Sequence, residues 1–165
     1  MSIPNIRERL VGCWRLVGYS ETSDGGEARH PLGTHPLGTI LYTPDGYMSA
    51  QLAKPGPYAD DQQPDAYAIA YAGPYEVNEQ ASTVAHQVQV SVIPSWLSTT
   101  QIRQVQFSEP DTLVLSASER SPRDGVMTTT TITWSRQPHT GGNHQPASAI
   151  LSLIHISEPT RQAEI

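Results

Sequence analysis

Short runs of alternating apolar and polar residues recur along most of this chain, separated by clusters of Gly, Pro and Asp. Residues 11–21 combine β-branched and aromatic side chains and stop shortly before Asp24-Gly25-Gly26, which predicts a strand followed by a loop. The loop repeats HPLGT at 30–34 and 35–39. Since this period is far too short for a solenoid unit, we interpret it as a local duplication in a connection.

Hairpin signals follow the loop. Pro44-Asp45-Gly46 separates two apolar runs, and it is the strongest turn signal in the chain because Pro presets the first turn angle and Gly accepts positive φ. The predicted strands after the first one are 39–43, 47–52, 74–78, 83–92, 101–107, 112–117 and the Thr-rich run 127–136.

One segment interrupts the strands. Residues 53–65 are rich in Pro and Asp, and residues 66–72 (AYAIAYA) are apolar with many alanines, which predicts a short helix between the third and fourth strands. About eight short strands with one helical interruption indicate an all-β, eight-stranded antiparallel up-and-down β-barrel. Closure of such a barrel removes the unpaired edges of an open sheet.

Composition narrows the function classes. The 165 residues fit one domain, and the net charge of −6, without any cluster of Lys or Arg, argues against a nucleic-acid partner. The single cysteine, Cys13, excludes an internal disulfide and a multi-thiolate metal site. Neither an apolar run of signal-peptide length at the N-terminus nor a run long enough to span a membrane occurs, so we expect a cytoplasmic protein without a membrane span.

The C-terminal tail differs from the rest. We expect the barrel domain over 1–137 and a disordered or non-native tail over 138–165. The string SLIHISEPTR at 152–161 resembles a peptide produced when a sequencing adapter is translated as coding sequence, so we interpret residues 152–165 as a non-native segment without an evolved function. The alternative is a genuine strand or helix that packs outside the barrel.

Motifs at both ends of the predicted barrel belong together. Gly12-Cys13-Trp14 is a G-x-W on the first strand, and Trp134-Ser135-Arg136 lies on the last. With LVGCWRLVGYSE, YTPDGYMSAQL, GPYEV and the VAHQV…IPSW region, the chain resembles the lipocalin-like domain family of calycin barrels over residues 10–136, and TPDGYMSAQ is the most specific piece.

The resemblance implies an eight-stranded barrel with a ligand cavity, a Trp that plugs the closed end, and an Arg that lies over its indole. It supplies no settled catalytic residue. Two departures stand out: the HPLGT duplication lengthens the first loop, and Gln87 stands where relatives often carry a second His.

The predicted strand 83–92 gives the first site candidate. His86 shares one face with four valines, so an inward valine face also turns the imidazole inward. A neutral imidazole both donates and accepts a hydrogen bond, which suits ligand orientation or proton transfer near pH 7. The alternative is a core histidine satisfied by the protein. The face consists of Val84, His86, Val88, Val90 and Val92.

The next strand gives an inward cation. Gln101, Arg103, Val105 and Phe107 share a face, which places Arg103 in the lumen or at its mouth. Because an unpaired buried charge is unfavourable, the guanidinium requires a ligand carboxylate or enolate, or a structural acid such as Glu76.

Aromatic residues complete the candidate ligand-binding set. Tyr75 could present a phenol to the cavity, and Trp96 lies in a connection where aromatic residues often cap one; packing roles are equal alternatives for both. Tyr47 shares a strand face with Ser49 and Gln51, and periodicity alone does not decide whether this face or the opposite one points inward. Tyr42 and Tyr71 are further rim candidates, whereas Cys13 is expected to be a packing residue. The ligand-binding candidates are His86, Arg103, Tyr75, Trp96, Tyr47 and Gln101.

Two functions remain open. The first is a small-molecule-binding protein with an apolar barrel cavity and a small hydrophobic partner. The second is a barrel enzyme that isomerises or cyclises a hydrophobic substrate, with His86 shuttling a proton and Arg103 stabilising negative charge. A filled barrel that acts through a protein partner is a third reading. We expect no cofactor and no metal, since phosphate-loop and nucleophile-elbow motifs are absent and five of the six histidines lie in the loop or tail. A homodimer is left open.

Overall fold

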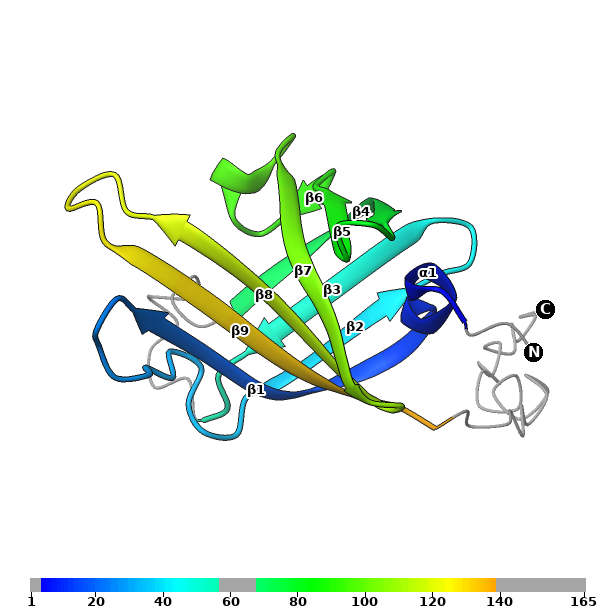
Figure 1. Cartoon of the computed structure of the whole chain (residues 1–165), viewed down its shortest axis with the longest axis horizontal. Coiled ribbons are helices and arrows are strands. Elements are labelled where there is room, and N and C mark those ends of the chain that lie inside the picture. The colour runs from blue at the N-terminus through cyan, green and yellow to red at the C-terminus, as the bar shows by residue number, and fades with distance from the viewer. Residues whose placement is uncertain (1–3, 57–67, 139–165) are drawn as a thin grey trace, which may run out of the picture.

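A computed structural model describes residues 4–56 and 68–138, and Figure 1 shows its strands wrapped around a common axis. The elements are α1 (Ile6–Leu10), β1 (Gly12–Ser23), β2 (Leu37–Tyr42), β3 (Tyr47–Ala53), β4 (Ala68–Asn78), β5 (Thr83–Gln87), β6 (Val90–Ser91), the 3-10 helix η2 (Pro94–Trp96), β7 (Thr100–Glu109), β8 (Thr112–Arg120) and β9 (Met127–Arg136).

The described strands close into an antiparallel barrel. They follow the order β3-β2-β1-β9-β8-β7-β5-β4-β6, and β3 also pairs with β4, which closes a ring of eight strands. The ninth strand, β6, pairs with β4 beyond β5. The predicted all-β barrel is therefore confirmed.

The helix expected between the third and fourth strands is wrong over the residues that the structure describes. Residues 68–72 form the first half of β4 and pair with β3, for example Ala70 with Gln51. Ile69 and Tyr71 alternate with alanines and continue the inward face toward Tyr75. This alternation outweighs the helix propensity of alanine because it buries Tyr71 and partly buries Ile69. The remainder of the predicted helix, 66–67, lies outside the described residues.

The predicted strand 83–92 is broken in two. Val84, His86 and Val88 are buried, but Val90 and Val92 are 66% and 56% exposed, so the expected five-residue inward face is wrong beyond Val88. The break lies beside Gly73, where an added Cβ would be 1.8 Å from the Gln87 carbonyl oxygen. Only glycine permits this close approach. After Gln87 the chain leaves β5, and it pairs with β4 again where the Gln89 amide donates to the Ala72 carbonyl.

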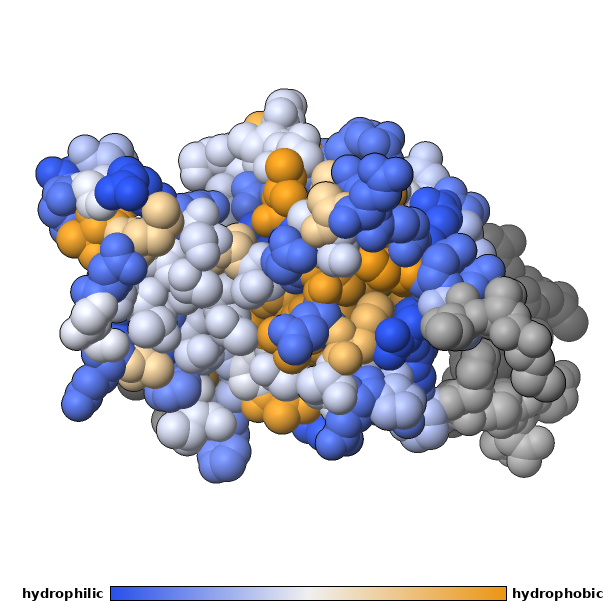
Figure 2. Space-filling model, in the orientation of Figure 1, coloured by the Kyte–Doolittle hydropathy of each residue, from blue (hydrophilic) through white to orange (hydrophobic). Residues whose placement is uncertain are grey.

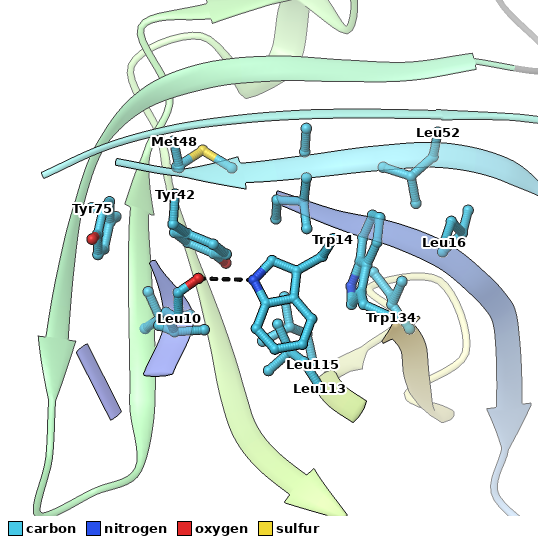
Figure 3. Close-up of a cluster of buried hydrophobic side chains, with 14 of the residues drawn as sticks. Leu10, Trp14, Leu16, Tyr42, Met48, Leu52, Tyr75, Leu113, Leu115 and Trp134 are labelled. Carbon is cyan, nitrogen blue, oxygen red and sulfur yellow. Dashed lines mark hydrogen bonds between the residues drawn. The ribbon is translucent and has the colours of Figure 1, made fainter. Parts of the chain in front are cut away.

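One end of the barrel is closed by Trp14 and α1 (Figure 3). The Trp14 indole donates to the Leu10 carbonyl at 2.8 Å, and both residues are fully buried. The Arg136 guanidinium lies 4.0 Å from the Trp14 ring centroid and donates to the Val11 carbonyl at 3.0 Å. The G-x-W motif and the last-strand arginine therefore form one unit, in the arrangement that the resemblance implies.

The N-terminal helix is also bound to the turn between β4 and β5. An Asn5–Glu8 capping box begins α1, and the Glu79 carboxylate in the β4–β5 turn accepts the Ile6 and Arg7 amides at 2.9 and 3.0 Å. Arg7 also lies over the Tyr75 ring. This helix thus covers the Trp14 end, at the right of Figure 1.

The outer surface is predominantly hydrophilic or neutral on the face that Figure 2 shows. In β9, Thr131 and Thr133 alternate with the buried residues Ile132 and Trp134. Figure 2 is nearly white toward the end away from α1 and has an apolar area in the middle of the view. Within the described ranges, no helix has the length and apolar character needed to cross a membrane. The tail prediction for 138–165 concerns residues that, apart from Pro138, lie outside the description.

Candidate functional site

A cavity of about 330 Å³ occupies the barrel on the far side of Trp14 from α1. Figure 3 shows Leu52 and Trp134 on the side of Trp14 that faces away from Leu10. The wall combines apolar side chains with polar ones from β1, β4, β7, β8 and β9. The lining residues are Tyr19, Glu21, Ile40, Leu52, Ile69, Tyr71, Trp96, Gln101, Arg103, Leu115, Ala117, Glu119, Thr130, Ile132 and Trp134.

Arg103 is the buried cation of this wall. Its side chain is 9% exposed, and its guanidinium donates to the Ile102 carbonyl at 3.0 Å and to Gln101 Oε1 at 3.1 Å. Among the described residues, no carboxylate lies within 4.0 Å of it. Glu76, the structural partner proposed from the sequence, is wrong for this role because it lies on the outer surface and accepts from Gln87.

His86 lies deeper than the cavity wall. It is fully buried between two phenols: Tyr42 Oη is 2.8 Å from Nε2, and Tyr71 Oη is 3.0 Å from Nδ1. Burial, reinforced by the positive charge of Arg103, lowers the pKa of His86 to about 3, so the imidazole is neutral at pH 7. His86 does not line the cavity itself, but it contacts Tyr71, which does.

Tyr71 connects the buried histidine to the cavity. Burial raises its pKa to about 12, although the positive charge of Arg103 opposes the shift, so the phenol stays protonated. Trp96 packs edge-on against the Tyr71 ring with centroids 5.4 Å apart. Trp96, Gln101 and Arg103 line the same cavity as Tyr71.

Two predicted ligand-binding residues lie outside the cavity. Tyr47 is 54% exposed on the outer face of β3. Tyr75 faces inward but lies near α1, and its hydroxyl donates to the Thr43 carbonyl at 2.8 Å. Tyr42, a rim candidate, is buried against Tyr75 and His86 and is not a rim residue. Strand parity gives the facing direction of a side chain but not its depth along the barrel, which explains the errors for Tyr75 and Tyr42.

Sequence reasoning missed several members of the wall. Ile132 and Trp134 could have been found from their alternation with threonine in β9. Trp134 is 1% exposed, and its indole N–H has no hydrogen-bond partner within the described part of the chain. Glu21 and Glu119 contribute carboxylates to the same wall, and the Tyr19 hydroxyl donates to Glu21 at 3.4 Å.

Two further positions bear on the sequence-based expectations. Gln87, where relatives often carry a second histidine, points outward and is exposed. A histidine at this position would therefore not face the cavity. Cys13 is a partly buried free thiol on the outward face of β1, beside the buried Trp14.

Comparisons with known proteins agree with this architecture. The model of a family described as "lipocalin-like domain" matches residues 11–137. A protein of Aspergillus oryzae named 4'-hydroxy-3'-methoxypropiophenone carrier protein is 31% identical over 109 residues, covering 55% of this chain and 97% of that protein.

Similar solved structures include insecticyanin from Manduca sexta, with 10% identity, a TM-score of 0.44 and coverage of 88% of this chain and 69% of that chain. A de novo designed fluorescence-activating β-barrel has 15% identity, a TM-score of 0.43 and coverage of 82% and 100%.

Proposed function

Because this chain belongs to the lipocalin-like domain family, we propose that its barrel binds a small, largely apolar molecule in the cavity beyond Trp14. The carrying observation is the cavity itself, about 330 Å³, whose wall combines apolar side chains with polar groups that include Tyr71, Gln101 and Arg103. Sites for small ligands typically combine these features, because apolar walls supply affinity and a few polar groups fix orientation.

The relative from Aspergillus oryzae suggests the kind of molecule to test first. Its name assigns it an aromatic ketone, 4'-hydroxy-3'-methoxypropiophenone, as cargo. A single substituted aromatic ring suits a cavity at the lower end of the usual ligand-site range, roughly 300–1,000 Å³. Trp96 and Tyr71 offer aromatic edges and faces for contact with such a ring.

Binding accounts for the buried groups better than proton-transfer catalysis. The enzyme alternative gave His86 the role of proton shuttle, but both its ring nitrogens are engaged by tyrosines. Its lowered pKa, about 3, also disfavours uptake of a proton near neutral pH. We therefore keep carriage or storage of a small molecule as the proposed function.

The test combines native mass spectrometry of the purified protein with titration of 4'-hydroxy-3'-methoxypropiophenone, followed by tryptophan fluorescence. We expect a saturable change, which Ala117→Phe abolishes because Ala117 lines the cavity and the added ring would fill it. The matched control is Ala85→Phe on the outer side of β5, which should bind as the wild type does.

Equal binding by Ala117→Phe and Ala85→Phe would place the ligand elsewhere and overturn the proposal. Absence of saturable binding in the wild type, together with no co-purified small molecule in native mass spectra, would also overturn it.

A further inference from the structure

Three buried rings form a hydrogen-bonded chain from the protein interior to the cavity. Tyr42, His86 and Tyr71 are 2%, 0% and 7% exposed, and their polar atoms are 2.8 and 3.0 Å apart. A neutral imidazole has one N–H donor and one acceptor nitrogen. One tyrosine therefore donates to His86, and the other accepts from it.

Two arrangements satisfy the imidazole. In the first, the Tyr42 hydroxyl donates to Nε2, and Nδ1–H donates to Tyr71 Oη. The Tyr71 O–H is then free to donate to another acceptor. In the second, the direction is reversed and the Tyr42 proton needs another acceptor.

Burial selects the first arrangement. Tyr42 does not line the cavity, and within the described ranges its hydroxyl contacts no acceptor other than His86. The second arrangement would leave a buried O–H without a partner, which is unfavourable. Tyr71 lines the cavity, where a ligand can accept a hydrogen bond from its hydroxyl. The chain of rings thus points the Tyr71 O–H into the cavity.

Arg103 contributes a second donor beside Tyr71. Its two hydrogen bonds, to Ile102 and Gln101, use only part of the five N–H groups of a guanidinium. Its positive charge adds to the effect of burial in lowering the pKa of His86, and it opposes the rise that burial causes in the pKa of Tyr71, as expected for a cation close to them. Two donors are therefore available to an oxygen on this side of the cavity.

The charges of the wall favour a neutral acceptor over a carboxylate. Glu21 from β1 and Glu119 from β8 line the same cavity, but Glu21 pairs with Arg29 at 3.6 Å and Glu119 is exposed. Counted with Arg29 and Arg103, the carboxylates and guanidiniums of this region balance. An anionic ligand would upset this balance and bury an additional charge, whereas a ketone accepts hydrogen bonds without a net charge.

We propose that the ligand is a neutral aromatic ketone whose carbonyl oxygen accepts hydrogen bonds from the Tyr71 hydroxyl and the Arg103 guanidinium, with His86 and Tyr42 as positioning residues. This inference rests on the proposed function and adds the orientation of the ligand and the group that it must carry.

The first experiment measures selectivity for the carbonyl. Calorimetry compares 4'-hydroxy-3'-methoxypropiophenone with 2-methoxy-4-propylphenol, in which a methylene replaces the carbonyl, and with 4-hydroxy-3-methoxybenzoate. We expect the wild type to bind the ketone about tenfold more tightly than the methylene compound, and the benzoate most weakly. Tyr71→Phe and Tyr42→Phe should each remove most of the ketone preference while leaving binding of the methylene compound nearly unchanged.

Matched controls distinguish positioning from general damage. Tyr75→Phe removes a hydroxyl bonded to the Thr43 carbonyl outside the cavity, so its ketone preference should equal that of the wild type. Trp134→Phe removes the unpartnered indole N–H from another part of the wall. Loss of the preference in Trp134→Phe but not in Tyr71→Phe would place the carbonyl elsewhere and overturn the inference.

The second experiment observes the histidine directly. Long-range ¹H–¹⁵N NMR spectra of the ligand-free protein should show His86 protonated at Nδ1 and bare at Nε2. Protonation at Nε2 would overturn the proposed direction of the chain. Binding of the ketone and the methylene compound with equal affinity would overturn this inference alone, whereas binding of none of the three compounds would count against the proposed function itself.

Discussion

At the residue scale, single side chains fix the closed end of the barrel. Gly12 adopts φ +132°, and an added Cβ would lie 3.0 Å from the Arg136 guanidinium. That guanidinium stacks on Trp14 and donates to the carbonyls of Val11 and Arg9. Glycine is thus required here for two reasons, its backbone conformation and the space that Arg136 occupies.

Gly12→Ala should therefore lower the free energy of unfolding by about 2 kcal/mol, since it strains the backbone and displaces Arg136 from Trp14. Urea unfolding measures the change. The control is Gly18→Ala in the same strand, where the new methyl group meets no atom within 4 Å. A loss for Gly12→Ala no larger than that for Gly18→Ala would contradict the explanation.

At the element scale, α1 is too short to be stable alone, and its contacts with the barrel hold it in place. Glu79 accepts two of its free N-terminal amides, and Leu10 at its other end accepts from Trp14. The helix thus links the β4–β5 turn to the tryptophan that closes the barrel.

Glu79→Ala is expected to destabilise the protein by about 1 kcal/mol, because two amides lose a charged acceptor at a helix N-terminus. Hydrogen exchange of the Ile6 and Arg7 amides should accelerate at the same time. Glu76→Ala, on the exposed face of β4, serves as the comparison and should leave both quantities close to those of the wild type. Unchanged exchange at Ile6 and Arg7 in Glu79→Ala would show that the carboxylate does not hold the helix.

At the scale of the whole molecule, closure of the barrel places a titratable ring at the centre of the fold. His86 is fully buried, and burial together with Arg103 lowers its pKa from 6.5 to about 3. The unfolded chain therefore binds a proton in the window between these two values, and the folded protein does not. Stability must fall as the pH decreases through that window.

Near the middle of this window, His86 alone changes the free energy of unfolding by about 1.4 kcal/mol per pH unit. We expect the free energy of unfolding of the wild type to fall more steeply between pH 6 and pH 4, roughly the middle of that window, than that of His86→Gln, because glutamine takes up no proton. Denaturant titrations at several pH values measure both slopes. Equal slopes in the wild type and His86→Gln would contradict the buried neutral state.

Part of this protein is determined by the sequence alone. Alternation of apolar and polar residues is a local property, and it predicted most of the strands, the closed barrel and the inward direction of His86 and Arg103. The resemblance to the lipocalin-like family, not the alternation, implied that Arg136 lies over Trp14. The tertiary structure decided the rest. It made 68–72 a strand, broke the strand after Gln87, and separated Tyr71 in the cavity wall from Tyr75 near α1. Depth along a barrel depends on the tilt and register of paired strands distant in sequence, so no local pattern specifies which inward side chains meet in the cavity.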